Sequence, residues 1–257
     1  MRIKQVYGNL KRMGRFMSFF DTYGLKFYNS KTEPAIFFGL YGKSDVKILR
    51  KHKGLAVLIW RGTDITKPGR LQQVKTMKNN VRHVSISYFI DNDLKKAHVP
   101  HKFLPIPGSN ISNINPEPLG NEIYVYLSYK RHKFYGGHIV DKISGDIPFK
   151  INIVKSNAGY SHEEILDIYK RCFLGLRLTE HDGIANQVIE MGLMGRCCVH
   201  NGNHPNAIKW NNAKDVIGII NKQSKRIGQI DSLMHDKVKK YLNIGEKWLQ
   251  TEFWGQT

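Results

Sequence analysis

Short apolar runs alternate with amphipathic stretches along most of the chain, and this pattern predicts its secondary structure. Uninterrupted apolar runs, such as the one over residues 55–60, are bounded by glycine or polar residues and are typical of buried strands. The stretches between them have helical spacing. Strands that alternate with helices form βαβ units, which build parallel sheets. We expect strands over residues 35–41, 55–60, 83–87, 103–106, 122–127, 149–154, 173–178 and 196–200.

Capping signals locate the ends of several helices. Ser161 and Glu164 form a capping box, in which each side chain binds the backbone amide of the other residue, and a helix is expected from there to residue 171. Ser44 has the position of an N-cap for a helix over residues 45–53. Further helices are expected over residues 133–143 and 186–194, and over most of residues 213–253 with breaks at Gly228 and Gly245.

A change in composition divides the chain near its middle. Residues 105–120 contain four prolines and three asparagines, which favour turns over helices and strands. We interpret this stretch as the connection between two domains, residues 1–115 and residues 116–257. The expected fold class is α/β, with two Rossmann-like domains and a cleft between them. A length of 257 residues fits two domains of this kind or one large one.

Positive charge is concentrated in the first half. The chain has 40 Lys and Arg residues against 21 Asp and Glu, and residues 1–120 hold 21 of the basic residues but 7 of the acidic ones. A surface this basic attracts polyanions such as nucleic acid, an anionic membrane or acidic glycans; the alternative is a solvated face without a partner. Aromatic residues lie among these charges between Phe16 and Tyr28, where they suit base stacking, a membrane face or the core.

The cysteine content and the lengths of the apolar runs indicate the cellular compartment of the protein. Three cysteines, two of them adjacent, cannot build a disulfide framework, so a reducing compartment is expected. The longest apolar run, over residues 55–60, is far too short to span a membrane. The N-terminus lacks the apolar stretch of a secretory signal. These features favour the cytoplasm, which is the host cytoplasm if the origin is viral, and we expect a monomer.

The most informative segment is a strand that leads through a loop into a helix. Asp182 lies in the loop, where it can reach a ligand, and Glu190 lies eight positions later on the helix. The backbone amides from Gly183 to Asn186 face the same space, and free amides at the start of a helix bind a diphosphate well. Carboxylates accept hydrogen bonds from sugar hydroxyls. This combination suits a nucleotide-sugar.

The pattern Asp182-Gly-x-Ala-x-x-Val-x-Glu190-Met-Gly-x-x-Gly resembles the glutamate–seven–glutamate motif of the GT-B glycosyltransferases, especially the retaining group 4-like enzymes. The resemblance implies that Glu190 holds the ribose hydroxyls of the donor and Asp182 those of the transferred sugar. It also implies that the amides near Ala185 and Asn186 meet the diphosphate. The first acidic residue of the motif is Asp in this chain, and Glu180 lies two positions earlier.

The same resemblance implies a mechanism and further site residues. The donor is a UDP- or GDP-linked sugar, transfer retains the anomeric configuration, and neither a metal nor another cofactor takes part. The leaving diphosphate is stabilised by positive groups and helps to deprotonate the acceptor. The N-terminal domain binds the acceptor, and the helical tail crosses back to brace it. The further candidates are Arg131 and Lys133 for the diphosphate, Asp64 for catalysis, and Arg61, Arg12 and Arg15 for the acceptor.

The acceptor is expected to bind the basic half. Lys and Arg spread over a face bind the phosphates of nucleic acid, and an enzyme that glycosylates a base must take it out of the stack. We favour a phage-type enzyme that glycosylates hydroxymethylated pyrimidines in DNA. The alternatives are a peripheral membrane glycosyltransferase that builds a lipid-linked or surface glycan, with residues 1–20 docked on anionic lipid, and a non-catalytic nucleic-acid-binding protein on a transferase scaffold.

Two other residue groups have the composition of metal sites. Asp91-Asn-Asp93 resembles the acidic triplet of the GT-A glycosyltransferases, although Asp91 also fits the N-cap of a helix over residues 92–97. His200 and His204 follow Cys197-Cys198, but a paired Cys-x-x-Cys is missing, and a buried cysteine pair on a strand is the alternative. We expect no metal at either group.

Overall fold

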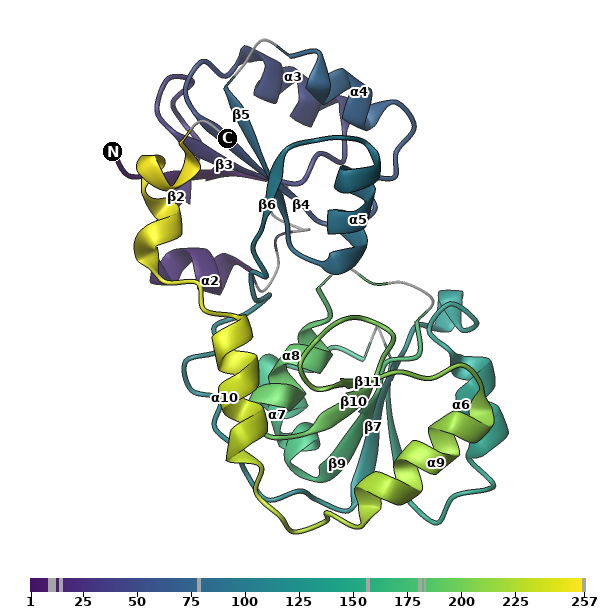
Figure 1. Cartoon of the computed structure of the whole chain (residues 1–257). Coiled ribbons are helices and arrows are strands. Elements are labelled where there is room, and N and C mark those ends of the chain that lie inside the picture. The colour runs from purple at the N-terminus through teal and green to yellow at the C-terminus, as the bar shows by residue number, and fades with distance from the viewer. Residues whose placement is uncertain are drawn as a thin grey trace. The chain divides into compact units, whose positions relative to one another are not determined.

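The computed structural model describes residues 1–8, 13, 16–77, 80–155, 158–179, 182 and 184–255, and the chain divides into two units (Figure 1). Unit 1 comprises Met1–Asn110 and Leu242–Thr257, and unit 2 comprises Ile111–Tyr241. Each unit contains one parallel sheet and several helices, which confirms the expected α/β class. The division after Asn110 lies inside the proline-rich stretch. Residues 242–257, however, belong to unit 1 and not to a second domain that extends to residue 257.

Unit 1 is built on a six-stranded sheet. Its strands are β1 Gln5–Tyr7, β2 Lys26–Phe27, β3 Ala35–Phe38, β4 Ala56–Trp60, β5 Val81–Ser85 and β6 His101–Phe103. They pair in the order β2-β1-β3-β4-β5-β6, each parallel to its neighbours. Every residue of β3 and β4 is buried, as expected for a parallel sheet covered on both faces. The helices are α2 Phe16–Thr22, α3 Lys43–Lys51, α4 Arg70–Lys75 and α5 Tyr88–Lys96.

Two helices of unit 1 begin earlier than predicted. α3 begins after Gly42, whose backbone amide donates to the Asp45 carboxylate at 2.7 Å, so the prediction that Ser44 is the N-cap is wrong. α5 begins after Ser87, whose hydroxyl accepts a hydrogen bond from a first-turn amide at 3.4 Å. Asp91 therefore lies inside the first turn of α5 and does not cap it.

Three aromatic residues of α2 belong to the core of unit 1, whereas Phe27 on β2 is 53% exposed. Phe16, Phe19 and Phe20 on α2 are buried, and Phe20 contacts Phe38 of β3 edge-on, with ring centroids 5.0 Å apart. Of the three uses that the sequence leaves open for these rings, the structure supports the core. They are not available to a docking patch over residues 1–20.

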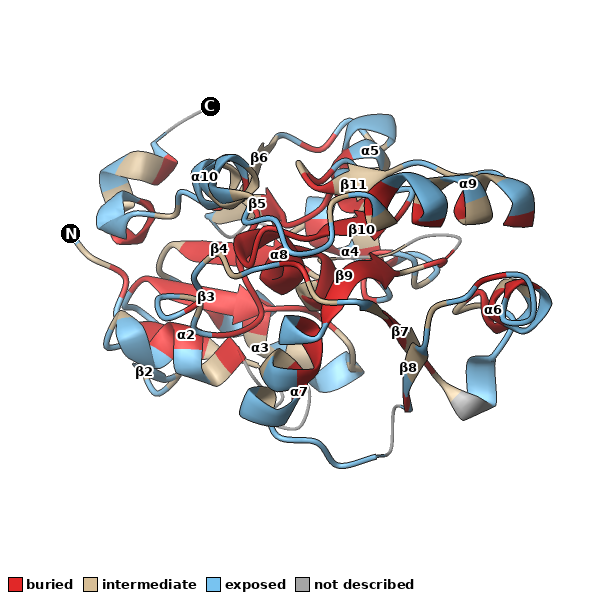
Figure 2. Cartoon of the chain, turned by 90° about the horizontal axis from the view of Figure 1, so that it is seen from below, coloured by how far each residue is buried: buried red, intermediate tan, exposed pale blue. Residues whose placement is uncertain are grey.

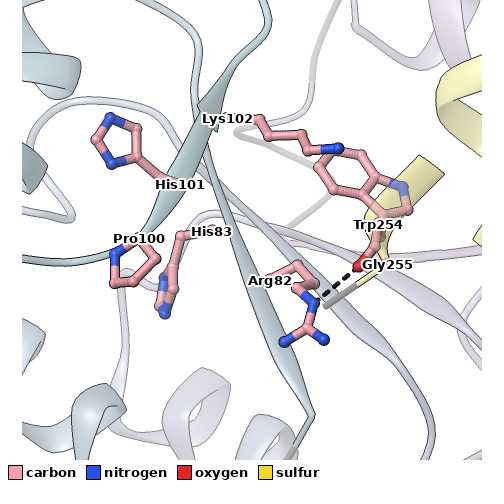
Figure 3. A pocket seen from close by; sticks show the side chains of 7 residues that line it. All are labelled: Arg82, His83, Pro100, His101, Lys102, Trp254 and Gly255. Carbon is pink, nitrogen blue, oxygen red and sulfur yellow. Dashed lines mark hydrogen bonds between the residues drawn. The ribbon is translucent and has the colours of Figure 1, made fainter. Parts of the chain in front are cut away.

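The C-terminal segment packs on unit 1, as expected for a tail that braces the N-terminal half. It contains two 3₁₀ helices, η2 Glu246–Leu249 and η3 Thr251–Trp254. Arg82 Nε on β5 donates to the Trp254 carbonyl at 2.9 Å. Figure 3 shows this contact beside a small pocket that β5 and β6 line together with the end of η3.

Unit 2 is built on a five-stranded sheet. Its strands are β7 Glu122–Leu127, β8 Ile151–Lys155, β9 Cys172–Leu176, β10 Cys197–Val199 and β11 Ala207–Ile208. They pair in the order β11-β10-β9-β7-β8, each parallel to its neighbours. The helices are η1 Tyr129–Arg131, α6 Gly137–Ile143, α7 His162–Lys170, α8 Asn186–Leu193, α9 Ala213–Ser224 and α10 Ser232–Tyr241. Figure 1 shows α7, α8 and α10 on one face of this sheet and α6 and α9 on the other.

Burial follows these layers. Figure 2 shows buried residues along the central strands, such as β3, β4 and β9, and exposed residues on the outer sides of the helices. The adjacent cysteines lie on β10 and are buried, as the strand interpretation of this pair requires. In the parts of the chain that the structure describes, no helix combines the length and the apolarity needed to cross a membrane.

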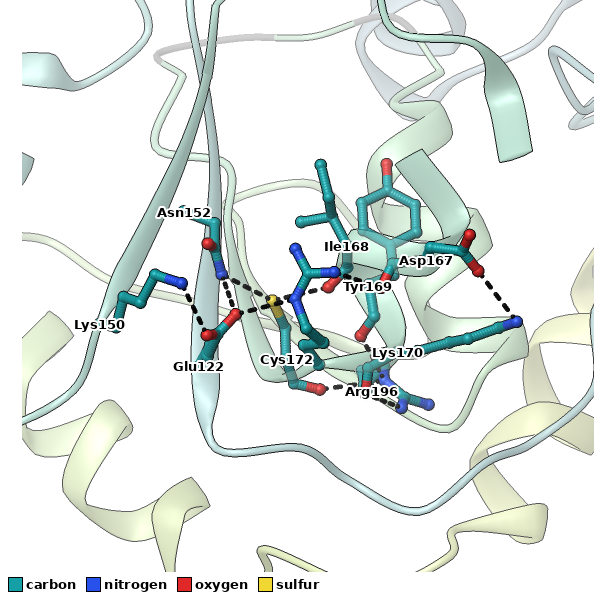
Figure 4. A network of polar contacts seen from close by, with 10 residues as sticks. Glu122, Lys150, Asn152, Asp167, Ile168, Tyr169, Lys170, Cys172 and Arg196 are labelled. Carbon is teal, nitrogen blue, oxygen red and sulfur yellow. Dashed lines mark hydrogen bonds and ion pairs between the residues drawn. The ribbon is translucent and has the colours of Figure 1, made fainter. Parts of the chain in front are cut away.

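A buried arginine connects several parts of unit 2. The side chain of Arg196, directly before β10, is fully buried, and Figure 4 shows it inside a network of polar contacts. Its guanidinium donates to backbone carbonyls at the ends of α7 and α8, at the start of β9 and in the segment before β7. These six acceptors are the carbonyls of Tyr169, Lys170, Cys172, Met194, Glu117 and Pro118.

Candidate functional site

The strand order of unit 2 indicates where a ligand binds. β7, the first strand of the unit, lies between β8 and β9, so the chain first proceeds to one side of β7 and later returns to the other. The loops after β7 and β9 therefore lead to helices on opposite faces of the sheet, α6 and α8 (Figure 1). In open parallel sheets, ligands bind beside such a point, at the edge where the strands end. We refer to this edge as the carboxyl edge. The acidic motif begins directly after β9, so it lies at this edge.

Arg177 lies at the centre of this region, directly after β9. Its Nε is 2.7 Å from Asp182 Oδ2. The guanidinium also lies over two aromatic rings, 5.3 Å from the centroid of Tyr126 and 4.9 Å from that of Tyr135. Burial lowers the pKa of Arg177, but the nearby carboxylate outweighs this effect and the pKa is raised overall. A permanently charged guanidinium is thus fixed at the carboxyl edge.

Asp182 occupies the position that the motif predicts, in the loop between β9 and α8. Its side chain is 17% exposed. Oδ2 accepts the hydrogen bond from Arg177, whereas Oδ1 has no partner among the described residues. Glu180 and Gly183, which the sequence also singles out, lie outside the described residues.

The helix that carries Glu190 begins where expected. α8 starts at Asn186 with Ala185 as its N-cap residue, and Gln187 Nε2 donates to the Leu176 carbonyl of β9 at 3.1 Å. The first amides of α8 therefore lie at the carboxyl edge, in the geometry that favours an anion.

Glu190 contacts a residue that the sequence pattern does not indicate. Its carboxylate is 1% exposed, and Oε1 lies 3.0 Å from Nε2 of His162. His162 is the first residue of α7, and the capping box of Ser161 and Glu164 holds that helix start as predicted. Since α7 is the helix that follows β8, this contact places the Glu190 side chain at the carboxyl edge as well.

The loops after β7 and β9 approach each other closely at one glycine. Gly136, before α6, has a φ of 72°, in the left-handed region that favours glycine. A Cβ at this position would lie 2.3 Å from Cβ of Leu178 and 2.6 Å from its carbonyl oxygen. The close packing of the two loops therefore depends on the absence of a side chain at Gly136.

We expect the substitution Gly136→Ala to destabilise unit 2 more than Gly159→Ala does. Both glycines have a φ of 72°, so both substitutions cost ~1–2 kcal/mol for the backbone. No atom lies within 4 Å of a Cβ at Gly159, whereas the contact with Leu178 adds ~1–3 kcal/mol of overpacking at Gly136. Denaturant unfolding of the two variants measures the difference, and equal losses of stability contradict this account.

The two basic residues predicted for the diphosphate lie after β7. Arg131 and Lys133 are both exposed, and the Arg131 guanidinium lies 4.0 Å from the centroid of the Phe134 ring. They follow β7 and so lie at the carboxyl edge, whereas Asp182 follows the neighbouring strand β9. Their contact with a phosphate stays a prediction.

Two histidines follow β10 at the same edge. His200 Nδ1 lies 3.2 Å from the Arg177 carbonyl, and the ring centroids of His200 and His204 are 5.4 Å apart. Burial lowers the pKa of His200, and burial together with His200 lowers the pKa of His204 to about 4. Both rings are therefore neutral at neutral pH and add no charge beside Arg177.

In unit 1, the predicted catalytic carboxylate anchors two loops. Asp64 is fully buried; its Oδ1 accepts from the amides of Arg61 at 3.0 Å and Gly62 at 2.9 Å, and its Oδ2 accepts from Leu40 at 3.3 Å. Burial raises the pKa of Asp64, while these amides lower it. The Asp64 carboxylate thus connects the loop after β3 to the loop after β4. Its catalytic role stays a prediction.

The basic candidates of unit 1 are described in part. The guanidinium of Arg61 lies between two rings, 4.4 Å from the centroid of Phe16 and 4.3 Å from that of Phe38. This contact holds the Arg61 side chain directly after β4, at the edge of the unit 1 sheet where its strands end. Arg12 and Arg15 lie outside the described residues.

The residues of the two rival metal sites have other partners. Asp91 pairs with Lys95 Nζ at 2.7 Å and with His101 Nε2 at 3.0 Å. Cys198 Sγ lies 3.7 Å from Met191 Sδ in the core. Among the described residues, no group of three or more His, Cys, Asp or Glu side chains has an arrangement that could hold a metal ion.

Solved structures resemble this fold, although the sequence matches no protein-family model and no curated protein at a significant level. A sucrose-phosphate synthase from Thermosynechococcus elongatus is 11% identical, with a TM-score of 0.55, over 91% of this chain and 73% of that one. A trehalose-6-phosphate protein from E. coli, solved with UDP-2-fluoro glucose, is 10% identical, with a TM-score of 0.56, over 96% of this chain and 78% of that one.

A mutant of TarM from S. aureus, solved with UDP, fondaparinux and alpha-GlcNAc-glycerol, is 13% identical, with a TM-score of 0.53. That match covers 86% of this chain and 54% of TarM. At these identities the similarity concerns the fold. The chain has the GT-B fold of these glycosyltransferases, with two Rossmann-like α/β units, as the sequence predicts.

Proposed function

We propose that the chain is a glycosyltransferase and that unit 2 binds its nucleotide-sugar donor. The observation that carries this proposal is the carboxyl edge of unit 2. There, the ion pair of Arg177 and Asp182 lies directly before α8, and Glu190 lies about one turn into that helix, next to His162. The presence of UDP or a UDP-sugar in two structures of the same fold supports the proposal.

Each part of the donor then has its own partner. Glu190 accepts hydrogen bonds from the ribose hydroxyls, and Asp182 accepts them from the transferred sugar. The first amides of α8, from Ala185 onward, bind the diphosphate together with Arg131 and Lys133. The donor is linked to UDP or GDP, and neither a metal nor another cofactor is required.

Transfer proceeds with retention of configuration. Amides and positive groups stabilise the charge that develops on the diphosphate as the bond to the sugar breaks, and the diphosphate takes the proton of the attacking hydroxyl. A structure of trehalose-6-phosphate synthase that is described as an enzyme of glycosyltransfer with retention has the same fold, which supports this step of the proposal.

The acceptor that we propose is a hydroxymethylated pyrimidine in DNA, bound by unit 1. Unit 1 has 22 Lys and Arg residues against 8 Asp and Glu, and this excess suits a phosphate backbone. Arg61 is the described candidate for a contact with the acceptor.

The three free cysteines support a reducing compartment, for which we propose the cytoplasm.

A second candidate is a glycosyltransferase that works at an anionic membrane. One observation favours it: Ile227 and Ile230, between α9 and α10, are 39% and 58% exposed, and Leu233, at the start of α10, is 65% exposed. Exposed lysines flank these side chains on both helices. Aliphatic side chains surrounded by lysines suit an anionic lipid surface.

A panel of UDP- and GDP-linked sugars, incubated with hydroxymethylated DNA and analysed by mass spectrometry, tests the proposal. We expect one donor to add the mass of one sugar residue to the DNA. Cosedimentation with anionic vesicles, without transfer to DNA, favours the membrane enzyme. If no donor is bound, hydrolysed or used, the chain is not a glycosyltransferase, and salt-sensitive binding to DNA would then indicate a non-catalytic binding protein.

A further inference from the structure

We infer that Arg177 is a positioning residue, which fixes Asp182 in the donor site and thereby makes the site selective for uncharged sugars. This inference rests on the proposed function and concerns the sugar part of the donor. The sequence pattern indicates Asp182 but not Arg177, and only the structure shows that the two side chains form an ion pair.

Arg177 is held from both sides of β9. Its guanidinium lies over Tyr126 of β7 and over Tyr135 in the loop that follows β7. Its backbone amide donates to the Val199 carbonyl of β10 at 3.0 Å, and its carbonyl lies 3.2 Å from Nδ1 of His200. The side chain and the backbone of Arg177 are therefore anchored to the two strands that border β9.

Asp182 depends on this anchor. It lies between β9 and α8, outside any helix or strand. The Nε–Oδ2 distance of 2.7 Å is that of a strong, charge-assisted hydrogen bond, and both side chains are less than one fifth exposed, at 13% and 17%. The bond fixes the carboxylate in one orientation and leaves Oδ1 as the oxygen that a ligand can use.

The charges of the pair determine which sugar fits. The guanidinium binds Oδ2 of Asp182, while Oδ1 keeps its negative partial charge and accepts a hydrogen bond from a hydroxyl group. A uronic acid carries a carboxylate at neutral pH, which the Asp182 carboxylate repels. Without Asp182, the Arg177 guanidinium would face the same space with an unpaired positive charge and would bind that carboxylate through two parallel hydrogen bonds.

The test compares the full-length chain with its variants in calorimetric titrations of UDP, UDP-glucose and UDP-glucuronate, and of the corresponding GDP series. We define the sugar contribution as the ratio of the affinities for UDP-glucose and UDP. In Arg177→Ala we expect this ratio to fall about tenfold while the affinity for UDP changes less than threefold. Arg177→Lys should restore part of the ratio, because it returns the charge without the guanidinium geometry.

Two further variants test the coupling between the residues. Asp182→Ala should lower the preference for UDP-glucose over UDP-glucuronate at least tenfold. The double variant Arg177→Ala/Asp182→Ala should lose no more of the sugar contribution than Asp182→Ala alone, because the two residues act as one unit. Additive losses, or equal losses of affinity for UDP and UDP-glucose, overturn the inference.

A matched ion pair elsewhere in unit 2 serves as the control. Arg226 and Asp231 are also five residues apart, partly buried and in hydrogen-bond contact, but they lie between α9 and α10. Arg226→Ala should leave the sugar contribution unchanged. The inference is also overturned if the wild-type chain binds UDP-glucose no more tightly than UDP. A chain that binds none of these nucleotides overturns the proposed function instead.

Discussion

Replacing Glu190 by glutamine is expected to weaken the binding of the nucleotide-sugar about a hundredfold. Glutamine has nearly the same volume, but it lacks the charge, and one of its two terminal groups is a donor that cannot accept a hydroxyl hydrogen. Hydrogen bonds to a charged group contribute ~1.5–3 kcal/mol each, and 1.4 kcal/mol corresponds to a factor of ten. The loss of one such bond to a ribose hydroxyl and the weakening of the other, ~3 kcal/mol together, account for the expected factor.

Calorimetric titration with the donor identified by the panel measures this effect. UDP or GDP alone should lose affinity by the same factor, because Glu190 is assigned to the ribose and not to the sugar. The matched control is Glu163→Gln, since Glu163 is an exposed residue of α7 next to His162. Unchanged affinity in Glu190→Gln, with a normal melting temperature, would show that the nucleotide binds elsewhere.

Local signals explain which parts of the fold the sequence predicts. The capping box of Ser161 and Glu164 lies within four residues, and α7 begins at the predicted place. β7 agrees with its prediction at both ends because its apolar run is bounded by polar residues on both sides. The strands β2 and β11 have two residues each, too few for a hydrophobic pattern, and β1, with the sequence Gln-Val-Tyr, contains no uninterrupted aliphatic run. None of these three strands is predicted from the sequence.

The partners of the site residues depend on strand order, which no local pattern sets. His162 and Glu190 are 28 residues apart, and they meet because α7 and α8 lie on the same face of the sheet. Tyr126 reaches Arg177 because β7 pairs with β9. The burial of Asp64 likewise depends on the contact between the loops after β3 and β4. The sequence thus indicates the positions of Asp182 and Glu190 but not the residues that hold them.

Replacing Arg196 by methionine is expected to destabilise unit 2 by at least ~3 kcal/mol. The guanidinium is fully buried and donates to six backbone carbonyls, several of them at the negatively polarised ends of α7 and α8. Methionine fills much of the volume but removes the guanidinium donors. Backbone amides still reach the carbonyls of Tyr169, Cys172 and Met194. Each buried carbonyl that is left unsatisfied costs ~1–3 kcal/mol. Arg196→Lys should restore little of the stability, because an ammonium group has three donors at one point and cannot span the six acceptors.

The effect should be confined to unit 2, since all six carbonyls belong to it. Hydrogen exchange followed by peptide mass spectrometry distinguishes the units: in Arg196→Met, the amides of β9, β10 and α7 should exchange faster, and those of β3 and β4 should not. The control is Arg171→Met, because Arg171 is half exposed and its contact with Glu122 is a surface ion pair worth at most ~1 kcal/mol. Equal losses of stability in the two variants would mean that the six carbonyls find other donors, most directly water that enters the space left by the guanidinium.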